Sequence, residues 1–289
     1  MIVDAHVHIE RKEDGSLYSP GEIVKAMDAG GVDVSVVFAN DQGDAGGRPS
    51  WAKDEIPVAT NFSDDDAAAF CREFPKRLAA VASVSPDRHR PERKVRRAVE
   101  ELGLKGVKLY PHSGFYPNDP RLYPVYEYCQ KAAVPVIIHT GIKAVRWQHM
   151  KFNHPVYVDD VATDFPDLQV VMCHGGYPWT EEFLAVVGSN PNVSVDITFL
   201  DYLEDKFKVP NLVENTMRRL NAIIGARRLI WGSEGPFMSL PLYGSHGIDN
   251  YRKCQERLVR RFDFLSEADK ADILGENAKR LFLNKGNRR

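Results

Sequence analysis

Two histidines separated by a single residue stand near the start of the chain, in Asp4-Ala5-His6-Val7-His8. Alternate side chains of a β-strand share a face, so Asp4, His6 and His8 are predicted to point in one direction. Two imidazoles roughly 7 Å apart at the backbone can converge on one ion beyond the end of the strand. Taken alone, the pair fits two partly exposed histidines at a chain terminus equally well.

Three later apolar runs also end in a residue that could bind a metal. The runs 136–138, 170–173 and 229–232 are followed by His139, by His174 and by Ser233-Glu234. Neutral imidazole and carboxylate are ligands that suit zinc, manganese, iron and nickel. The pattern therefore predicts a centre for one divalent metal, for which zinc is the first expectation and manganese, iron or nickel are the alternatives.

These residues must be brought together by the elements that carry them, and short β-branched runs alternate with amphipathic stretches along the whole chain. The predicted strands are 2–8, 32–38, 78–84, 106–110, 136–139, 168–174, 193–196 and 229–232. The predicted helices are 20–29, 64–72, 91–102, 122–133, 156–165, 179–189, 211–224 and 250–261. Eight strands alternating with helices imply parallel pairing, and eight is also the number that closes a barrel. We predict a single-domain α/β (β/α)₈ TIM barrel over residues 1–289, with an open doubly wound sheet as the alternative.

Composition excludes several classes of partner. The 289 residues include 38 Lys and Arg against 40 Asp and Glu, which gives a net charge of −2. Nucleic acid and acidic membrane surfaces usually require a basic excess, so neither is expected, and the expected partner is a small-molecule substrate. The four scattered cysteines and an N-terminus without signal-peptide features favour a cytoplasmic protein with free thiols.

One lysine and three further side chains are the predicted substrate contacts. Lys108 shares strand parity with Tyr110, and an inward lysine near the end of a strand is costly unless it is paired or used. Lys108 could bind a substrate carboxylate, carry a carbamate that bridges two metals, or extend to the barrel mouth. Arg146 also suits carboxylates and Trp147 suits a flat ring, and Tyr177 completes the set.

Three long loops follow predicted strands, at 39–63, 112–121 and 235–247, which is the face where barrel enzymes keep their active sites. His112 and His246 lie in these loops and could reach a substrate, although ordinary loop histidines are the first expectation. His89, His149 and His154 are expected at the surface or at helix ends. Trp51, Tyr116 and Trp147 fit either a cover over the site or a homodimer interface, and both alternatives stay open.

The same residues resemble a known family. Asp-x-His-x-His in the first strand, single histidines ending the fifth and sixth strands, and Gly232-Ser233-Glu234-x-Pro236 after the eighth are similar to the amidohydrolase superfamily. His174-Gly175-Gly176, Trp231-Gly232-Ser233 and the segment 274–282 resemble its amidohydrolase-related branch. That branch includes aminocarboxymuconate-semialdehyde decarboxylase, resorcylate-type decarboxylases and pyrone-dicarboxylate lactonase. The resemblance runs from residue 2 to about residue 283. TatD-type nucleases share the opening motif, but the bridging Glu that they carry is absent from the third and fourth strands here.

The resemblance implies a role for each site residue. His6, His8 and His139 would be metal ligands, His174 would polarise the substrate or trade protons, and the acid at 234 would contact the metal and its water. The family has Asp at this last position, where this chain has Glu234. The extra methylene moves the carboxylate by roughly 1.5 Å, whereas ligand oxygens lie at about 2.0–2.2 Å from zinc. Either the backbone at Ser233-Glu234 retreats, or Glu234 reaches past the metal.

The leading hypothesis is metal-dependent hydrolysis of a small carboxylated or cyclic substrate, such as a lactone or an amide. Glu234 would take a proton from a metal-activated water, and His174 would stabilise the oxyanion or protonate the leaving group. The same ligands suit non-oxidative decarboxylation of an aromatic or unsaturated acid, in which Glu234 or His174 would protonate carbon. A third alternative is a non-catalytic ligand-binding barrel, for which Glu234 is the only hint.

Overall fold

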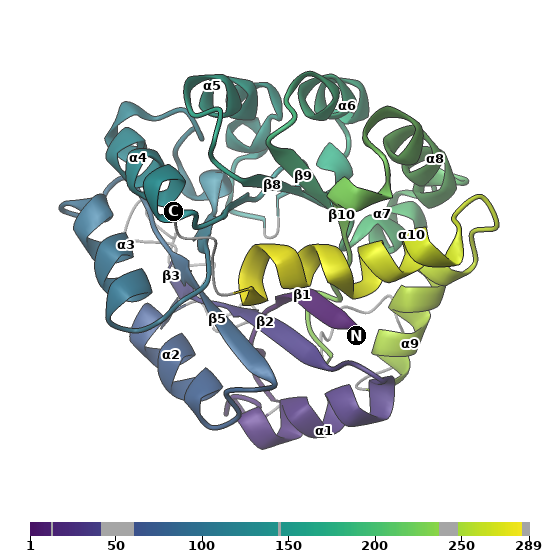
Figure 1. The fold of residues 1–289 in the computed structure, drawn as a ribbon, viewed down its shortest axis with the longest axis horizontal. Coiled ribbons are helices and arrows are strands. Elements are labelled where there is room, and N and C mark those ends of the chain that lie inside the picture. Colours follow the sequence, from purple (N-terminus) through teal and green to yellow (C-terminus); the bar gives the residue numbers. More distant parts are fainter. Residues whose placement is uncertain (13, 42–60, 144–145, 237–247, 285–289) are drawn as a thin grey trace.

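Eight parallel strands form one sheet that curves into a barrel inside a ring of helices (Figure 1). The computed structural model describes residues 1–12, 14–41, 61–143, 146–236 and 248–284. In sheet order the strands are β1 (Val3–Val7), β2 (Val34–Phe38), β5 (Leu78–Ser83), β6 (Val107–Leu109), β7 (Val136–Ile138), β8 (Val170–Cys173), β9 (Val193–Asp196) and β10 (Leu229–Ile230). The amide of Ala5 donates to the Trp231 carbonyl at 3.1 Å, and the amide of His8 donates to the Glu234 carbonyl at 3.1 Å. These bonds join the first strand to the last, and the predicted TIM barrel is confirmed.

The surrounding helices follow the strands in chain order. They are α1 (Pro20–Gly30), α2 (Asp64–Arg72), α3 (Pro91–Glu100), α4 (Tyr123–Ala132), α5 (Val156–Asp164), α6 (Thr180–Ser189), α7 (Leu200–Phe207), α8 (Leu212–Ile224), α9 (Ile248–Gln255) and α10 (Glu267–Ala271). Ser19, Ser63 and Ser266 begin α1, α2 and α10 with capping boxes, which satisfy the first free amides of each helix. Among the described residues, no helix combines the length and the apolar character needed to cross a membrane.

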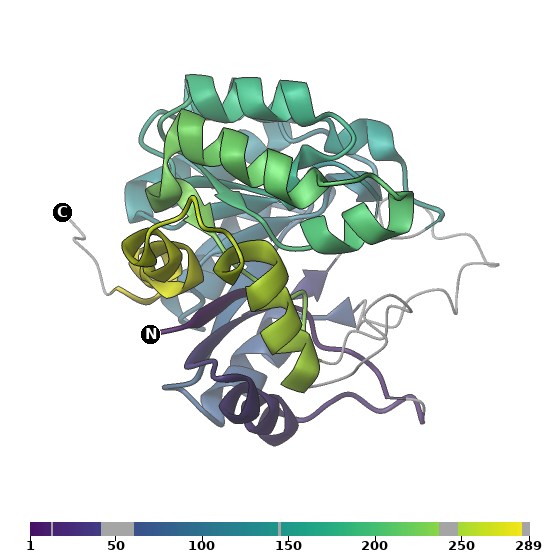
Figure 2. The same ribbon diagram turned by 90° about the vertical axis from the view of Figure 1, so that its right-hand side faces the viewer.

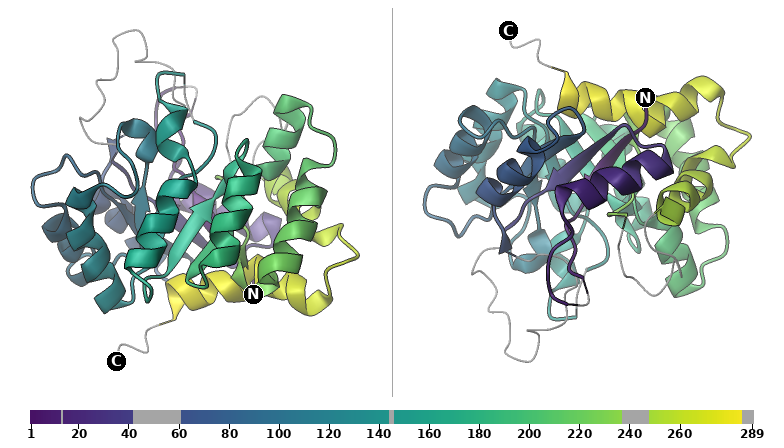
Figure 3. Two further views of the ribbon diagram at one scale, coloured as in Figure 1. Left: turned by 90° about the horizontal axis from the view of Figure 1, so that it is seen from above. Right: turned by 90° about the horizontal axis from the view of Figure 1, so that it is seen from below.

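Two helical segments were not predicted. The short helix α7 precedes the predicted helix α8, and α10 continues through the π-helical turns Asp272–Glu276 and Lys279–Leu283. The latter segment crosses the end of the barrel at which the N-terminus lies (Figures 2 and 3). The Trp231 amide donates to the Ile273 carbonyl at 3.0 Å, and Phe282 joins the apolar cluster inside the barrel. This helix therefore closes the end of the barrel where the strands begin.

The strand β1 contains one extra residue relative to β2. Val3 and Asp4 pair with Val34 and Ser35, whereas Val7 pairs with Val37. Two residues of β1 therefore lie opposite the single residue of β2 between 35 and 37, which is a β-bulge. A bulge bends the strand and changes the direction of the side chains beyond it.

The bulge corrects the predicted alternation of β1. Val3 and Ala5 belong to the apolar cluster inside the barrel, and the ring of His6 also lies inside, 4.5 Å from that of Phe38. Asp4 does not share this face, because it pairs with Ser35 on the outer side. The prediction that Asp4 points with the two histidines was wrong, since strict alternation assumes a regular strand.

The structure also describes a short antiparallel pair, β3 (Asn40–Asp41) with β4 (Asn61–Phe62), after β2. Most of the predicted loop 39–63, including Trp51, lies outside the described residues, as does most of 235–247 with His246.

Candidate metal centre

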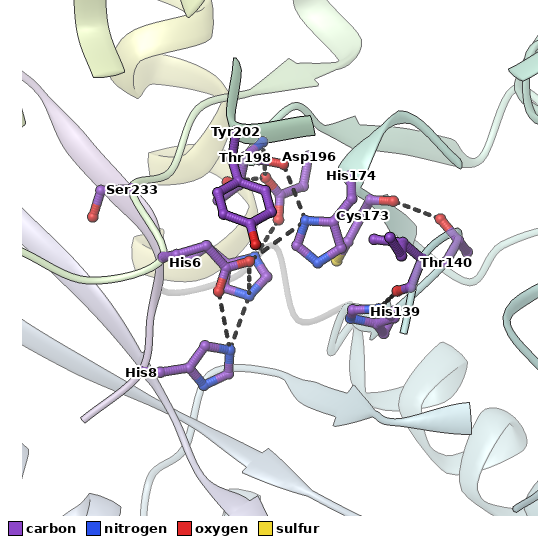
Figure 4. Close-up of polar contacts among 12 residues, drawn as sticks. His6, His8, His139, Thr140, Cys173, His174, Asp196, Thr198, Tyr202 and Ser233 are labelled. Atoms are coloured by element: carbon purple, nitrogen blue, oxygen red, sulfur yellow. Dashed lines mark hydrogen bonds and ion pairs between the residues drawn. The ribbon is translucent and has the colours of Figure 1, made fainter. Parts of the chain in front are cut away.

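Three of the predicted ligands meet at the carboxyl ends of the strands (Figure 4). The Nε2 atoms of His6 and His8 are 3.2 Å apart. The two Glu234 carboxylate oxygens each lie 3.5 Å from one of these nitrogens, Oε1 from His6 and Oε2 from His8. Ligand atoms of these three buried residues lie within 4.8 Å of one another. Ligand atoms bound to one ion at about 2.0–2.2 Å would be separated by similar distances.

The position of Glu234 follows from the backbone that carries it. Its φ of +68° lies in the left-handed region, and its backbone forms a parallel bridge with Val7. The outward Asp4 accepts hydrogen bonds from the Ser233 amide at 2.9 Å and from the Ser233 hydroxyl at 2.6 Å. A Cβ at Gly232 would lie 2.6 Å from the Cβ of His6, so this close approach of the last strand requires glycine. These constraints direct the Glu234 side chain, which is one methylene longer than that of Asp, back over β1.

Asp196, which the sequence analysis did not single out, holds the other side of His6. Asp196 is the last residue of β9 and faces the barrel interior. Its Oδ2 lies 2.5 Å from His6 Nδ1, and both side chains are buried. Thr198 donates to the second oxygen of Asp196 from its amide and its hydroxyl. A carboxylate on Nδ1 fixes the proton there and leaves the Nε2 lone pair for a metal. The only available signal was an acid at the end of a predicted strand.

His174 and His139 extend the cluster of rings. His174 has a φ of +64°, and its Nδ1 lies 3.0 Å from the Thr198 carbonyl and 3.4 Å from Glu234 Oε1. The His139 ring lies 4.6 Å from that of His174. However, His139 Nε2 is 2.7 Å from the Ile142 carbonyl, and His139 is not part of the group of ligand atoms within 4.8 Å. The structure thus brings His139 to the site but not into the tightest donor group.

His112 lies beside His139 and is buried, with ring centroids 4.4 Å apart. The sequence predicted an ordinary loop histidine here, and this burial corrects that prediction. A 3₁₀ turn, Pro111–Ser113, follows β6 and carries His112 to the ring of His139. His89 and His149 are exposed, as predicted.

Lys108 is fully buried on the inward face of β6, as its parity predicted. Its ammonium donates to Cys173 Sγ at 3.2 Å and lies 5.0 Å from the centre of the Phe38 ring. No carboxylate of the described residues lies within 4.0 Å of this ammonium. A buried cation with no close counter-charge is costly, so Lys108 is suited to meet an anion at the site.

The remaining predicted contacts lie further out. Arg146 is exposed and Trp147 is half-buried, both next to residues 144–145, which are outside the described part of the chain. The Tyr177 ring packs against Phe207 of α7, with centroids 5.3 Å apart. The roles of these three residues as substrate contacts stay predictions.

The electrostatics of the cluster favour neutral histidines. Burial and then the charge of Lys108 lower the pKa of both His8 and His139 to about 3. Burial raises the pKa of Glu234 to about 8, against the lowering influence of Lys108. Neutral imidazole is the form that binds a metal, and a divalent ion would supply the positive charge that a buried carboxylate lacks. The donor set therefore fits a divalent ion held by His6, His8 and Glu234.

The fold and this cluster define a (β/α)₈ barrel with a histidine and carboxylate centre at the ends of its strands. The chain belongs to the amidohydrolase family, because the family model described as Amidohydrolase matches residues 3–283. A curated relative is the 2-amino-3-carboxymuconate-6-semialdehyde decarboxylase of Dictyostelium discoideum. It is 25% identical over an alignment of 254 positions, and the alignment covers 79% of this chain and 67% of the relative.

Solved structures of similar proteins share the fold. A probable 2-pyrone-4,6-dicarboxylic acid hydrolase from Acinetobacter baumannii superposes with a TM-score of 0.66 at 15% identity, over 97% of this chain and 98% of the other. A 2,6-dihydroxybenzoate decarboxylase from Rhizobium gives a TM-score of 0.65 at 18% identity, over 99% of each chain. The family and these neighbours are enzymes that include both hydrolases and decarboxylases.

Proposed function

We propose that the chain is a metal-dependent hydrolase that acts on a small carboxylated or cyclic organic substrate, such as a lactone or an amide. The observation that carries this proposal is the convergence of His6, His8 and Glu234, with His174 at 3.4 Å from the Glu234 carboxylate. Three donors suited to a metal and a histidine suited to proton transfer thus lie close together. Membership of the amidohydrolase family supports the same reaction class.

His6, His8 and Glu234 would hold the ion, with His139 as the further predicted ligand. A bound divalent ion, for which zinc is the first expectation and manganese, iron or nickel are the alternatives, supplies a Lewis acid and lowers the pKa of water. Asp196 would keep His6 in the tautomer that offers Nε2. Because burial keeps these imidazoles neutral, no proton has to leave them before their lone pairs bind the ion.

Proton transfer falls to Glu234 and His174. A carbonyl can only accept, so His174 Nδ1–H donates to the Thr198 carbonyl and the neutral ring has its free lone pair at Nε2. His174 is therefore prepared to take a proton at Nε2 and to return it to a leaving group. The Glu234 carboxylate, next to His174, would accept the proton of the attacking water.

Lys108 supplies the argument for a carboxylated substrate. Its ammonium is fully buried inside the barrel, next to the Cys173 thiol and the Phe38 ring. An anionic group of the substrate would provide the missing counter-charge. Arg146, Trp147 and Tyr177 would contact the outer part of the same substrate.

Non-oxidative decarboxylation of an aromatic or unsaturated acid is the second candidate. The observation that favours it is the curated relative, which is named as a decarboxylase. Here the same residues would hold the substrate carboxylate, and Glu234 or His174 would deliver a proton to carbon.

Product analysis on the zinc-loaded protein separates the two reactions. 2-Pyrone-4,6-dicarboxylate tests ring opening by the fall in ring absorbance, simple lactones test it by the acid that is released, and 2,6-dihydroxybenzoate tests release of carbon dioxide. His174→Asn should reduce turnover, whereas the matched change His154→Asn, outside the cluster, should not. If the purified protein binds no divalent ion, and His6→Ala with His8→Ala leaves turnover unchanged, the metal-dependent mechanism is excluded for both reactions.

We also propose that the protein acts in the cytoplasm without a nucleic-acid or membrane partner, and that Tyr116 and Trp147 either cover the site or form a homodimer interface. Sedimentation of the purified chain tests the assembly.

A further inference from the structure

Cys173 is the last residue of β8, and it points into the barrel beside the proposed centre. It pairs with Asp196 on β9 and belongs to the same inner cluster as Val171, two residues earlier. Its side chain is fully buried. The sulfur thus lies at the level of the barrel where Asp196 holds His6 (Figure 4).

The sulfur also lies within reach of two histidines of the cluster. Ligand atoms of His6, Cys173 and His174 lie within 4.8 Å of one another, which makes a second donor group that shares His6 with the first. The two groups share His6, whose Nδ1 faces Asp196 and whose Nε2 lies 3.2 Å from His8 Nε2. An ion bound to His6 would therefore have His8 and Glu234 from one group, and Cys173 and His174 from the other, as its neighbouring donors.

Building on the proposed metal centre, we propose that Cys173 Sγ is a ligand of the same ion. The centre would then offer a soft thiolate in addition to imidazole and carboxylate. Thiolate ligands favour zinc, cobalt and cadmium over manganese and magnesium.

Lys108 explains how a thiolate can be held in this position. Its ammonium donates an N–H···S hydrogen bond to Cys173 at 3.2 Å, and metal-bound ligands commonly receive such a bond from an outer partner. On binding, a sulfur–metal bond replaces the S–H bond, and the released proton passes to the solvent. The thiolate charge then lies beside both the ion and the Lys108 ammonium, whose other two N–H groups can still meet a substrate anion.

The test is to load the metal-free full-length chain with Co²⁺ and to record the absorption spectrum together with the metal content. The wild type should bind cobalt and show the near-ultraviolet charge-transfer band of a cobalt–thiolate bond. Cys173→Ser should lose this band and bind Cd²⁺ at least about tenfold more weakly, since even outer partners of a metal ligand are worth 10–100-fold. Cys129→Ser is the matched control, because Cys129 is equally buried but lies in α4, and it should keep the band.

Two outcomes overturn the proposal. One is a cobalt-loaded wild type without the charge-transfer band, and the other is a Cys173→Ser protein that keeps the band. In both cases the protein still binds a metal, so the proposed hydrolase function is not contradicted. A chain that binds no ion at all defeats the metal centre itself, so the two failures are distinct.

A measurement on the wild type avoids dependence on the folding of a variant. X-ray absorption of the zinc-loaded protein should show one sulfur at about 2.3 Å from the ion. A shell made only of nitrogen and oxygen contradicts a Cys173 ligand.

Discussion

The two ends of the barrel interior are lined by the same strands but have opposite chemistry. Near the start of the strands the inward residues are apolar, and they pack with Phe282 of the C-terminal helix; they include Val3, Ala5, Val36, Ile137, Val171 and Ile230. One inward step further along, the residues are His6, Lys108, His139, Cys173 and Asp196, all of them buried. One end stabilises the fold and the other concentrates polar groups at a cost in stability. Such a division is expected when function is carried at the carboxyl ends of the strands.

The strand β1 passes from apolar to polar inward residues in a different way from β7 and β8. In β7 and β8, the inward residues Ile137 and Val171 are followed two positions later by His139 and Cys173, as regular alternation requires. In β1 the bulge places Ala5 and His6 on the same side in succession. The first strand can therefore present two histidines to the site and still keep Asp4 outside to bind Ser233.

The largest effect is expected from removing the two histidines of β1. The double variant His6→Ala and His8→Ala should lose the bound ion and lower turnover by about 100-fold or more, since even residues that only orient a metal ligand are worth 10–100-fold. Metal content after dialysis and turnover are the measurements. The exposed His149→Ala is the control, and unchanged metal content in the double variant would place the ion elsewhere.

A smaller effect is expected when the support of His6 is weakened. Asp196→Asn keeps the size of the side chain but removes the charge that fixes the His6 tautomer, so metal affinity should fall by about 10–100-fold. A competition titration with a chromophoric chelator measures this. Asp167→Asn, on the surface, should have no effect. Equal affinities in the two variants would show that Asp196 does not orient the ligand.

Replacing the buried cation should separate stability from function. Lys108→Met retains volume and removes a buried charge, and exchanges of buried ionic groups for apolar ones are neutral or stabilising by about 1–4 kcal/mol. We expect an unchanged or raised free energy of unfolding in urea, together with weaker binding of carboxylated substrates, seen as a higher KM. A marked loss of stability would mean that the ammonium has a structural partner.

The smallest effect is expected at the apolar end. Ile137→Val removes one methylene from the packed interior and should lower the free energy of unfolding by about 0.5–1.5 kcal/mol. Metal content per folded chain should not change. Ile223→Val, where the side chain is 48% exposed, is the matched control and should leave the urea midpoint in place. A loss of metal at Ile137→Val would show that the two ends of the interior are coupled.

Much of the fold could be predicted from the sequence because its signals are local. Apolar β-branched runs such as 136–138 and 170–173 specify buried strands, and their number fits closure into a barrel without excluding an open sheet. The inward direction of Lys108 followed from simple alternation and was confirmed. The short helix α7 was missed because eight residues carry little periodic signal, and the helical segment after α10 is defined by its packing across the barrel end.

The sequence by itself determined which residues would stand at the strand ends, since the order of His6, His8, His139, His174 and Glu234 relative to apolar runs is written in the chain. Only the tertiary structure decided how these residues meet. The bulge in β1, the contact of Asp196 with His6 across 190 positions, and the burial of His112 depend on neighbours that are distant in sequence. Local patterns fix the direction of a side chain along a regular strand. They do not contain the strand pairing that produces a bulge, or the distant residue that completes a side chain's hydrogen bond.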